Sequence, residues 1–418
     1  MALERVRVDV ERHAGSGAKG FFCLGDCVER MTALLPGYEG KIKLIYMDPP
    51  YLTGDRFYMR LRVGEAGWRP SGKTHRVEAF EDLKDRALYL EQMRRVLTLC
   101  RRLLCEEGMI FVHIDYRIHP HMRLLMDELF GEDNFLNEII WVYQTGGRSQ
   151  RHFSRKHDVI LFYRKSEQYD FDIEAVKAVP TLPRTNHMRR HVDPDGRVYR
   201  SIRSGGKLYT YYDDEPVAPS DVWTDLSHLQ QRDPERTGYD TQKPLALLTR
   251  IVKCASRPGD WVLDPFSGSG TTLEAAWRLG RRFIGIDRQA LTVNLLRRRL
   301  RGADYALYLN DGGPEGEAPV CEAEARTGIG FYHIALERFE ADLGGLPLTV
   351  PLDAVDSWAA GYLRDGDFEA MAEFARDRRC PALQRELRVP MYAGRLAICV
   401  NDVLGRSWTY ALSPSEMA

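Results

Sequence analysis

The stretch WVLDPFSGSGTTLEAAWRLGRRFIGID, residues 261–287, contains the pattern from which the fold can be predicted. An apolar run, a glycine-containing loop, a segment with helical spacing and a second apolar run predict strand, loop, helix and strand. Gly268 and Gly270 allow a tight turn and close approach of the backbone to a ligand. Asp287 follows Gly268 by 19 residues, where a carboxylate can accept hydrogen bonds from both hydroxyls of a ribose. The pattern therefore predicts a nucleoside-binding α/β unit.

The glycine loop narrows the class of nucleoside ligand. It lacks the Lys-Ser/Thr pair of a phosphate-binding P-loop and the third glycine of the dinucleotide fingerprint. A triphosphate or a dinucleotide is therefore disfavoured, and with it a nicotinamide-dependent dehydrogenase. A ribose ligand with a small charged tail fits better, and S-adenosylmethionine is the leading candidate. The alternative is a tight strand-to-helix turn that binds no ligand.

Strands and helices also alternate on the amino-terminal side of this unit. FFCLGDCVERMTALLPGYEGKIKLIYMDPPY, residues 21–51, predicts a strand, a helix, a strand and a turn. Residues 52–78, with their glycines and charges, predict a long loop, and residues 80–105 predict a helix. Further strands are predicted at 109–115, 137–143 and 157–165. Such alternation is typical of a parallel sheet covered on both faces, so the fold class is predicted to be α/β.

The second motif is DPPY, residues 48–51, which directly follows a predicted strand. The two prolines stop the strand and stiffen the turn after it. This arrangement suits the activation of an exocyclic amine on a nucleobase. Asp48 and the Pro49 carbonyl can each accept one N–H, which favours a tetrahedral nitrogen that can attack the methyl group of a sulfonium. Tyr51 can stack on a base that has left the duplex. The alternative is a strand-ending turn without chemistry.

Together, DPPY and DPFSGSGTT resemble the site-specific DNA amino-methyltransferases. Because DPPY precedes the glycine loop by over 200 residues, the order resembles the β group of that family. The segments FFCLGDCVERM, KHDVILFYRK and GYDTQKPLALLTRIV also resemble family segments. The resemblance implies a circularly permuted Rossmann-like methyltransferase fold, with a mostly parallel sheet and helices on both faces. It also implies an inserted target-recognition region and S-adenosylmethionine as the cofactor.

The resemblance further implies roles for individual residues. The target base would be held and activated by Asp48, Pro49, Pro50 and Tyr51. The cofactor would be bound by Asp26 at its adenine, by Thr241, Gln242 and Lys243 at its carboxylate, by Asp264, Phe266, Gly268, Gly270 and Thr271 along its methionine and ribose, and by Asp287 at the ribose hydroxyls. No metal ion is expected.

Four parts of the chain are predicted. Residues 1–165 would form the catalytic half of the methyltransferase domain, and residues 166–235 the target-recognition region. Residues 236–310 would form the cofactor-binding half, and residues 320–418 a C-terminal α+β appendage.

Charge is distributed unevenly along the chain, although the net charge is −1. Residues 146–210 contain 14 Lys and Arg against 7 Asp and Glu, whereas residues 311–377 contain 15 Asp and Glu against 4 Arg. The first segment could present a basic face to a polyanion, and the second should face away from it. We expect contacts with DNA phosphates from Arg148, Arg151, Arg155 and Lys156.

Several features indicate the compartment. No apolar run reaches the roughly 18 residues that a membrane-spanning helix needs, and MALERVRVDVERHAG lacks the apolar centre of a secretory signal. The eight cysteines are scattered without the spacing of a zinc site, which favours reduced thiols. We expect a cytoplasmic protein without a membrane partner.

The sequence hypothesis is therefore a methyltransferase that flips adenine out of duplex DNA and methylates its N6 amine by direct in-line transfer. DPPY is usual in adenine enzymes, whereas cytosine-N4 enzymes more often have Ser first. Two alternatives keep the reaction but change the methyl acceptor, to N4 of cytosine or to adenine in RNA. A third is a recognition subunit that works with a partner restriction endonuclease. A homodimer is left open. Phe153 or Tyr143 could fill the gap left by the flipped base, with core packing as the alternative.

Overall fold

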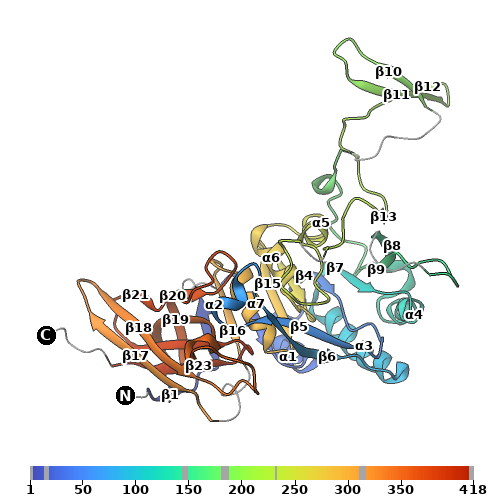
Figure 1. Ribbon diagram of the computed structural model, residues 1–418. Coiled ribbons are helices and arrows are strands. Elements are labelled where there is room, and N and C mark those ends of the chain that lie inside the picture. The colour runs from blue at the N-terminus through green and yellow to red at the C-terminus, as the bar shows by residue number, and fades with distance from the viewer. Residues whose placement is uncertain are drawn as a thin grey trace.

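The computed structural model describes residues 3–13, 18–143, 149–179, 188–230, 233–309 and 317–413. Its central part is an α/β body, and an all-β part lies at one end of it (Figure 1). A slender three-stranded arm projects from the body on the other side (Figure 1).

The body is built on a run of six strands that pair in parallel. They are apolar along most of their length because helices bury both faces. In spatial order they are β16 (Tyr305–Tyr308), β3 (Gly20–Leu24), β15 (Arg282–Asp287), β14 (Trp261–Asp264), β4 (Ile42–Met47) and β7 (Leu104–Ile114). The sheet continues beyond β7 through β9 (His157–Arg164), β8 (Phe135–Val142) and the short β13 (Val222–Trp223).

Helices cover both faces of this sheet (Figure 1). One face carries α1 (Cys27–Tyr38), α3 (Arg86–Leu103) and α4 (His119–Phe130), and the other carries α5 (Leu245–Ala255), α6 (Thr271–Arg278) and α7 (Leu291–Arg299). Side chains of β4 alternate between the two cores: Ile45 and Met47 pack in the first, Leu44 and Tyr46 in the second. The predicted α/β class, with a mostly parallel central sheet covered on both faces, is confirmed. Among the helices described here, none is long and apolar enough to cross a bilayer.

Sheet order brings the two sequence motifs together. β14 pairs in parallel with β4, and Leu263 lies opposite Ile45. Parallel neighbours end at the same edge of a sheet, so the loop after β14 and the turn after β4 meet there. Residues that are more than 200 positions apart in the chain thus become neighbours.

The segment between β4 and α3 differs from the long loop expected at residues 52–78. It forms an antiparallel hairpin of β5 (Arg56–Arg62) and β6 (Thr74–Glu81), with the short helix α2 (Gly64–Trp68) between them. Alternate residues of β5, Met59 and Leu61, are buried, while most of its other side chains are charged. Only one face of the hairpin is buried, so its strands contain few apolar residues. The many charged residues on the other face make the alternating pattern hard to recognise in the sequence.

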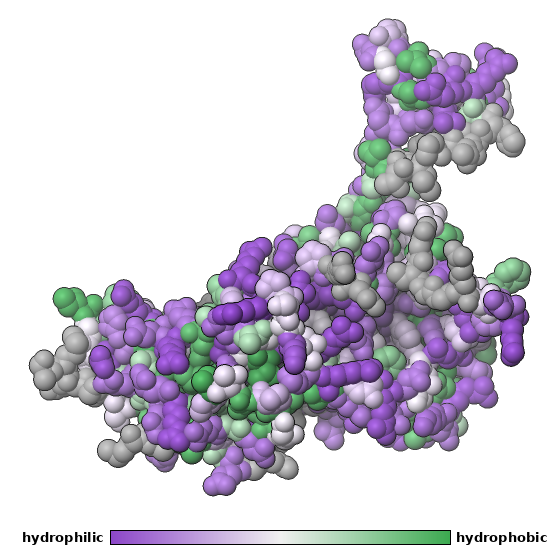
Figure 2. All heavy atoms as spheres, viewed as in Figure 1, coloured by the Kyte–Doolittle hydropathy of each residue, from purple (hydrophilic) through white to green (hydrophobic). Residues whose placement is uncertain are grey.

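The arm is an antiparallel sheet of β10 (Arg189–Val192), β11 (Val198–Ser204) and β12 (Lys207–Tyr212). Its strands are held together by ring contacts: His191 stacks on Tyr199, which also contacts the tilted ring of Tyr212. Apolar side chains are exposed on it among charged ones (Figure 2), among them Val192 and Leu208. Short 3-10 turns lie elsewhere, at Glu132–Asn134 and Glu174–Val176.

The all-β part corrects the expected α+β appendage. Its described residues form strands and one 3-10 turn, Pro351–Ala354. The strands are β17 (Val320–Thr327), β18 (Phe331–Glu340), β19 (Val355–Arg364), β20 (Asp367–Ala375), β21 (Glu386–Pro390), β22 (Arg395–Asp402) and β23 (Ser407–Ala411). β20 contains FEAMAEFA, whose composition favours a helix, but it pairs with a strand on either side. Pairing and burial therefore override local propensity here.

Two N-terminal strands join the all-β part to the body. β2 (Val10–His13) pairs with β16 of the body and with β20, and β1 (Arg5–Val6) pairs with β23. Next to this junction, Arg297 of α7 forms a buried ion pair with Glu11 and donates to Ser407 Oγ over 3.0 Å. The two parts thus share one continuous sheet and a buried polar contact.

Candidate active site

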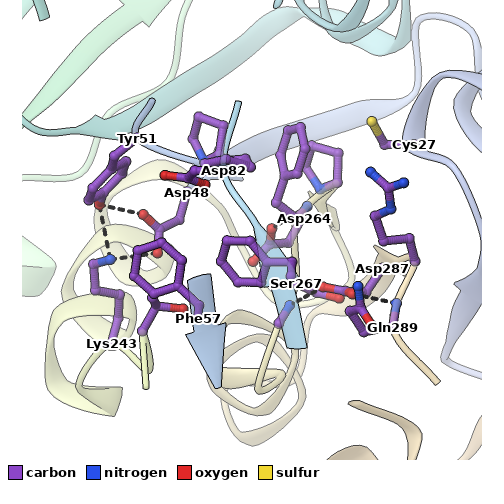
Figure 3. A pocket seen from close by; sticks show the side chains of 18 of the residues that line it. Cys27, Asp48, Tyr51, Phe57, Asp82, Lys243, Asp264, Ser267, Asp287 and Gln289 are labelled. Atoms are coloured by element: carbon purple, nitrogen blue, oxygen red, sulfur yellow. Dashed lines mark hydrogen bonds and ion pairs between the residues drawn. The ribbon is translucent and has the colours of Figure 1, made fainter. Parts of the chain in front are cut away.

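A cavity of about 890 Å³ opens where the central parallel strands end. Its walls come from the turns after β3, β4, β14 and β15, together with the segment before α5 and the β5–β6 hairpin. Asp48, Tyr51 and Lys243 gather at one end, and Asp287 and Cys27 lie at the other (Figure 3). Asp264 and Phe57 lie between them (Figure 3). One cavity therefore connects the DPPY turn to the glycine loop.

The DPPY turn follows β4 directly and places its aspartate and tyrosine against each other. Tyr51 Oη donates to Asp48 Oδ1 over 2.5 Å. Burial and the neighbouring Asp48 charge raise the pKa of Tyr51 well above its ordinary value, so this hydroxyl keeps its proton. The Tyr51 ring lies at 6.3 Å from the His113 ring, with 27° between their planes. The turn therefore presents a carboxylate with a fixed direction.

The other oxygen of Asp48 is bound by a residue from the opposite half of the body. Lys243 Nζ lies 2.6 Å from Asp48 Oδ2 and donates to Tyr51 Oη over 3.0 Å (Figure 3). The ion pair is largely enclosed, with side-chain exposures of 11% for Lys243 and 14% for Asp48. The resemblance implied that Lys243 contacts the cofactor carboxylate. It did not imply the contact with Asp48, which comes from the structure alone.

A network of buried polar side chains supports the turn from behind. His113 is fully buried, with Nδ1 at 2.9 Å from Tyr46 Oη and Nε2 at 3.3 Å from Asp158 Oδ2. Tyr143 Oη donates to Asp158 Oδ1 over 3.1 Å. Burial would raise the pKa of Asp158, but the hydrogen bond and charge of His113 lower it. This network was not predicted from the sequence, although an aspartate at the start of an otherwise apolar strand was a signal for Asp158.

The chain leaves the DPPY turn through a strained residue. Leu52 has a φ of 56°, in the left-handed region that leucine rarely adopts. The next residue is held by Asp82, whose Oδ2 accepts from Thr53 N over 3.0 Å and from Thr53 Oγ1 over 2.8 Å. These bonds stabilise the strained conformation and fix where the turn points.

The glycine loop begins where β14 ends and is tied to the next strand. Gly268 has a φ of 46°, and its N–H donates to Asp287 Oδ2 over 2.8 Å. A Cβ atom at this position would lie 3.2 Å from the ring of Tyr239, a buried cavity residue that the sequence reading missed. Gln289 N donates to the second oxygen of Asp287 over 2.9 Å. Burial raises the pKa of Asp287 to about 6.

Other predicted cofactor residues on this loop also line the cavity: Asp264, Phe266 and Thr271. Asp264 Oδ1 accepts from the N–H of Phe266 over 3.1 Å. Burial raises the pKa of Asp264 to about 7, against the lowering effect of hydrogen bonds from Thr272 and the Phe266 backbone.

Gly270 lies against α7. It is not among the residues that line the cavity, and its φ is 77°. A Cβ atom there would lie 2.4 Å from Leu296 Cδ2. Gly270 therefore allows close packing of α6 on α7, and its role at the cofactor stays a prediction.

The remaining predicted cofactor residues also lie at the cavity wall, but they differ in how far hydrogen bonds within the protein already occupy their side chains. Asp26 caps α1 by accepting from Val28 N over 2.9 Å. Thr241 lines the cavity. The Gln242 amide is already bound, because its Oε1 accepts from Thr237 and its Nε2 donates to the Glu235 carbonyl. Its side chain stabilises the loop before α5 instead of pointing a free amide at a ligand.

The cavity suits the nucleoside with a charged tail that the sequence predicts. Two buried polar atoms of the cavity wall, Asp82 Oδ1 and Tyr89 Oη, have no hydrogen-bond partner within the described ranges. A ligand with donors and acceptors can satisfy such atoms. The Asp287 carboxylate has lone pairs left after its two backbone bonds, as a ribose requires.

The predicted DNA contacts lie in the segment that joins β8 to β9. Arg148 falls outside the described residues. Arg151 is exposed, and the Arg155 guanidinium lies 4.0 Å from the centre of the Tyr116 ring. Tyr143 N donates to the carbonyl of Lys156 over 2.9 Å. Since Tyr143 and Asp158 line the cavity, this segment begins and ends at its wall, and the contacts with DNA stay a prediction.

Comparison with known proteins identifies a family model that matches this region. The model described as DNA methylase matches residues 42–297, which include the DPPY turn, the glycine loop and the inserted arm.

Two curated relatives agree with this match. The type II methyltransferase M.EcaI of Enterobacter cloacae is 30% identical over 308 residues, which cover 62% of this chain and 65% of that enzyme. The chain thus spans just under two thirds of that relative. The DNA adenine methyltransferase YhdJ of Escherichia coli K12 is 29% identical, over 63% of this chain and 78% of YhdJ. The solved complex of M1.HpyAVI with SAM is 19% identical, covers 67% of this chain and 98% of its own, and has a TM-score of 0.41.

Proposed function

Because the chain belongs to the N6/N4 DNA methylase family, we propose that it methylates an exocyclic amine of a DNA base, and that this amine is N6 of adenine. The observation that carries the proposal is the pairing of β14 with β4, which puts the glycine loop and Asp48 into one cavity. The methyl donor of this family is S-adenosylmethionine.

Each end of the cavity would hold one reactant. Asp287 accepts hydrogen bonds from the ribose hydroxyls, while Phe266 and the Gly268 turn line the rest of the cofactor. When bound, the sulfonium supplies an electrophilic methyl group. Asp48 and the Pro49 carbonyl would accept hydrogen bonds from the two N–H groups of the target amine and orient its lone pair, and Tyr51 would stack on the base. The nitrogen would gain the methyl group as the methyl–sulfur bond breaks, the thioether would be left as the product, and one N–H proton would then pass to solvent. Asp48 also stabilises the positive charge that develops on the nitrogen.

Base flipping follows from the depth of the catalytic turn. Asp48 is 14% exposed, so a base within a duplex cannot reach it. Of the two aromatic residues considered for the vacated space, Tyr143 is held at Asp158 and is half-buried. Phe153 is 98% exposed on the segment between β8 and β9. Phe153 is therefore the better candidate to enter the duplex, and Arg151 and Arg155 would bind phosphates beside it.

Adenine is proposed over cytosine on two grounds: the first residue of the DPPY turn is Asp, and YhdJ is named as an adenine enzyme. The family includes both specificities, and each target is an exocyclic amine on an aromatic ring. Recognition of a DNA site by the arm, a homodimer and a partner restriction endonuclease are further predictions.

The test is product analysis on DNA. A host lacking methylation is given this chain or its Asp48→Ala variant, and nucleosides are identified by mass spectrometry. We expect N6-methyladenine with the wild-type chain and none with the variant, while both proteins still bind S-adenosylhomocysteine. N4-methylcytosine as the sole product would refute the adenine assignment. Methylome sequencing of the same host would give the recognition site.

A further inference from the structure

We propose that Lys243 occupies the position of the target amine before the cofactor binds, and that the carboxylate of the cofactor draws its ammonium away from Asp48. The base can then enter. This inference deepens the proposed function and rests on it, because it concerns how the same site accepts its two reactants.

The contacts of Lys243 are those that the base itself would need. Its Nζ lies 2.6 Å from Asp48 Oδ2, which is the acceptor for the target N–H. The same atom lies 5.2 Å from the centre of the Tyr51 ring, the stacking surface for the base. A nitrogen donor is thus already bound where the target nitrogen would bind. The lysine and the base cannot occupy this position together.

Charge also requires Lys243 to leave. The target nitrogen becomes positively charged as it takes up the methyl group, and Asp48 is the nearby anion that stabilises it. Lys243 neutralises Asp48 and carries a positive charge itself. While it is bound there, it therefore disfavours the positive charge that forms on the target nitrogen. Transfer should therefore be fast only in molecules in which the ammonium has left the carboxylate.

The position of the Lys243 backbone permits such a movement. Thr271 Oγ1 donates to the Lys243 carbonyl over 3.2 Å, which anchors this residue beside the glycine loop. From that anchor, the flexible four-carbon stem allows the ammonium to move within the cavity that Lys243 lines. Gln242 cannot take over a carboxylate because its amide is bound to Thr237 and Glu235.

The other cations at the cavity wall are less suited to this role. Arg117 is paired with Asp115 over 2.8 Å, and Arg95 with Glu91 over 2.5 Å. Arg288 follows Asp287, at the ribose end. Lys243 is therefore the cation that links the catalytic turn to the cofactor carboxylate, and the cofactor should bind before the base.

The first experiment measures ligand binding without DNA, by calorimetry. It compares S-adenosylhomocysteine with 5′-methylthioadenosine, which has the same nucleoside but no amino acid. Lys243→Met should weaken the binding of S-adenosylhomocysteine about 10- to 100-fold, the range for a lost hydrogen bond to a charged group. It should leave the binding of methylthioadenosine unchanged. Asp48→Asn should have the opposite effect and tighten the binding of S-adenosylhomocysteine, because Asp48 then no longer competes with the ligand carboxylate for Lys243. Lys253→Met, on the last turn of α5, is the matched control.

The second experiment follows base entry in the wild-type protein, using duplex DNA with 2-aminopurine at the target position. Fluorescence should rise on adding S-adenosylhomocysteine but not methylthioadenosine. In Lys243→Met it should rise without any ligand. This experiment needs no variant for its main result, so a folding defect in Lys243→Met would leave the test intact.

Equal base entry in the wild-type protein with no ligand and with either ligand would overturn the inference. So would equal weakening of both ligands by Lys243→Met. In both cases the proposed function survives if wild-type protein still methylates DNA. If S-adenosylhomocysteine fails to bind the wild-type protein at all, the proposed function itself is wrong.

Discussion

Gly268 donates its backbone N–H to Asp287 Oδ2 over 2.8 Å, which ties the turn after β14 to the end of β15. The bond fixes the direction of the Asp287 carboxylate, and burial raises its pKa to about 6. A carboxyl with this pKa changes its charge close to physiological pH, so cofactor binding should depend on pH.

The affinity for S-adenosylhomocysteine should fall as the pH is lowered through about 6. Protonation removes lone pairs that the ribose hydroxyls need, and the loss should approach about tenfold per pH unit below the pKa of Asp287. Calorimetry between pH 5 and 8 measures it. Asp287→Asn is the control, with weak binding that varies less with pH, because Asp264, with a pKa of about 7, still titrates at the site. Constant affinity of the wild-type protein down to pH 5 would contradict the prediction.

Without ligand, stability should change with pH in the opposite direction. Burial raises the pKa of Asp264 from 3.8 to about 7. The folded state therefore binds more protons than the unfolded state between these values, and the free energy of unfolding falls as the pH rises through them. The shift corresponds to about 4 kcal/mol. Urea denaturation from pH 4 to 8 checks this. Asp264→Asn should reduce the slope, and the raised pKa of Asp287 should account for part of the slope that remains.

Gly270→Ala should destabilise the fold more than Gly302→Ala. Both glycines have positive φ, 77° and 82°, so both substitutions carry backbone strain of about 1 kcal/mol or more. At Gly302 the added Cβ meets nothing within 4 Å, whereas at Gly270 it would lie 2.4 Å from Leu296. Overpacking should add about 1–3 kcal/mol at Gly270. Equal urea midpoints for the two variants would show that α6 and α7 can move apart freely.

Phe153→Ala should slow methylation of a fully paired duplex without lowering the melting temperature of the protein. A side chain that is 98% exposed contributes little to folding. Opening a base pair costs a few kcal/mol, so we expect a loss of about tenfold or more in kcat/KM. A duplex with an abasic site opposite the target should restore the rate. Leu124→Ala, on the surface of α4, is the control, and an equal effect of both variants would refute a role in base flipping.

Glu11→Gln should destabilise the protein by about 3–5 kcal/mol, because it leaves the Arg297 charge buried without its partner. Both side chains are at most 3% exposed. Replacing both residues by methionine should recover much of this loss, since no unpaired charge then remains. Thermal unfolding of the three proteins measures the difference. A small loss in the single variant would mean that water or Ser407 compensates for the missing carboxylate.

The sequence was most informative where a local pattern determines the structure. Apolar runs at Ile42–Met47 and Arg282–Asp287 are buried from both sides, so the α/β class and the two turns that form the cavity could be predicted. Two predictions were wrong: the α+β class of the C-terminal part, whose strand β20 pairs with distant strands, and the loop at residues 52–78, where charges on an exposed face conceal the period of the β5–β6 hairpin.

The site shows the same limit. Asp48 and Asp287 were identified because a short motif surrounds each of them. The ion pair between Lys243 and Asp48 joins residues 195 positions apart, and no local pattern contains that information. The close approach of Gly270 to α7 could not be predicted either, because a glycine with positive φ has the same sequence signature whether it serves a ligand or a neighbouring helix.

The pairing of Arg5 in β1 with Tyr410 in β23 has a consequence for synthesis on the ribosome. At about 5–20 residues per second, roughly 20–80 s pass between the emergence of these two strands. During that interval the parallel core can assemble, but β1 lacks its partner strand and β2 lacks β20. Strands β1 and β2 are therefore synthesised well before these partner strands, and a chaperone that shields an unpaired strand would act in that interval.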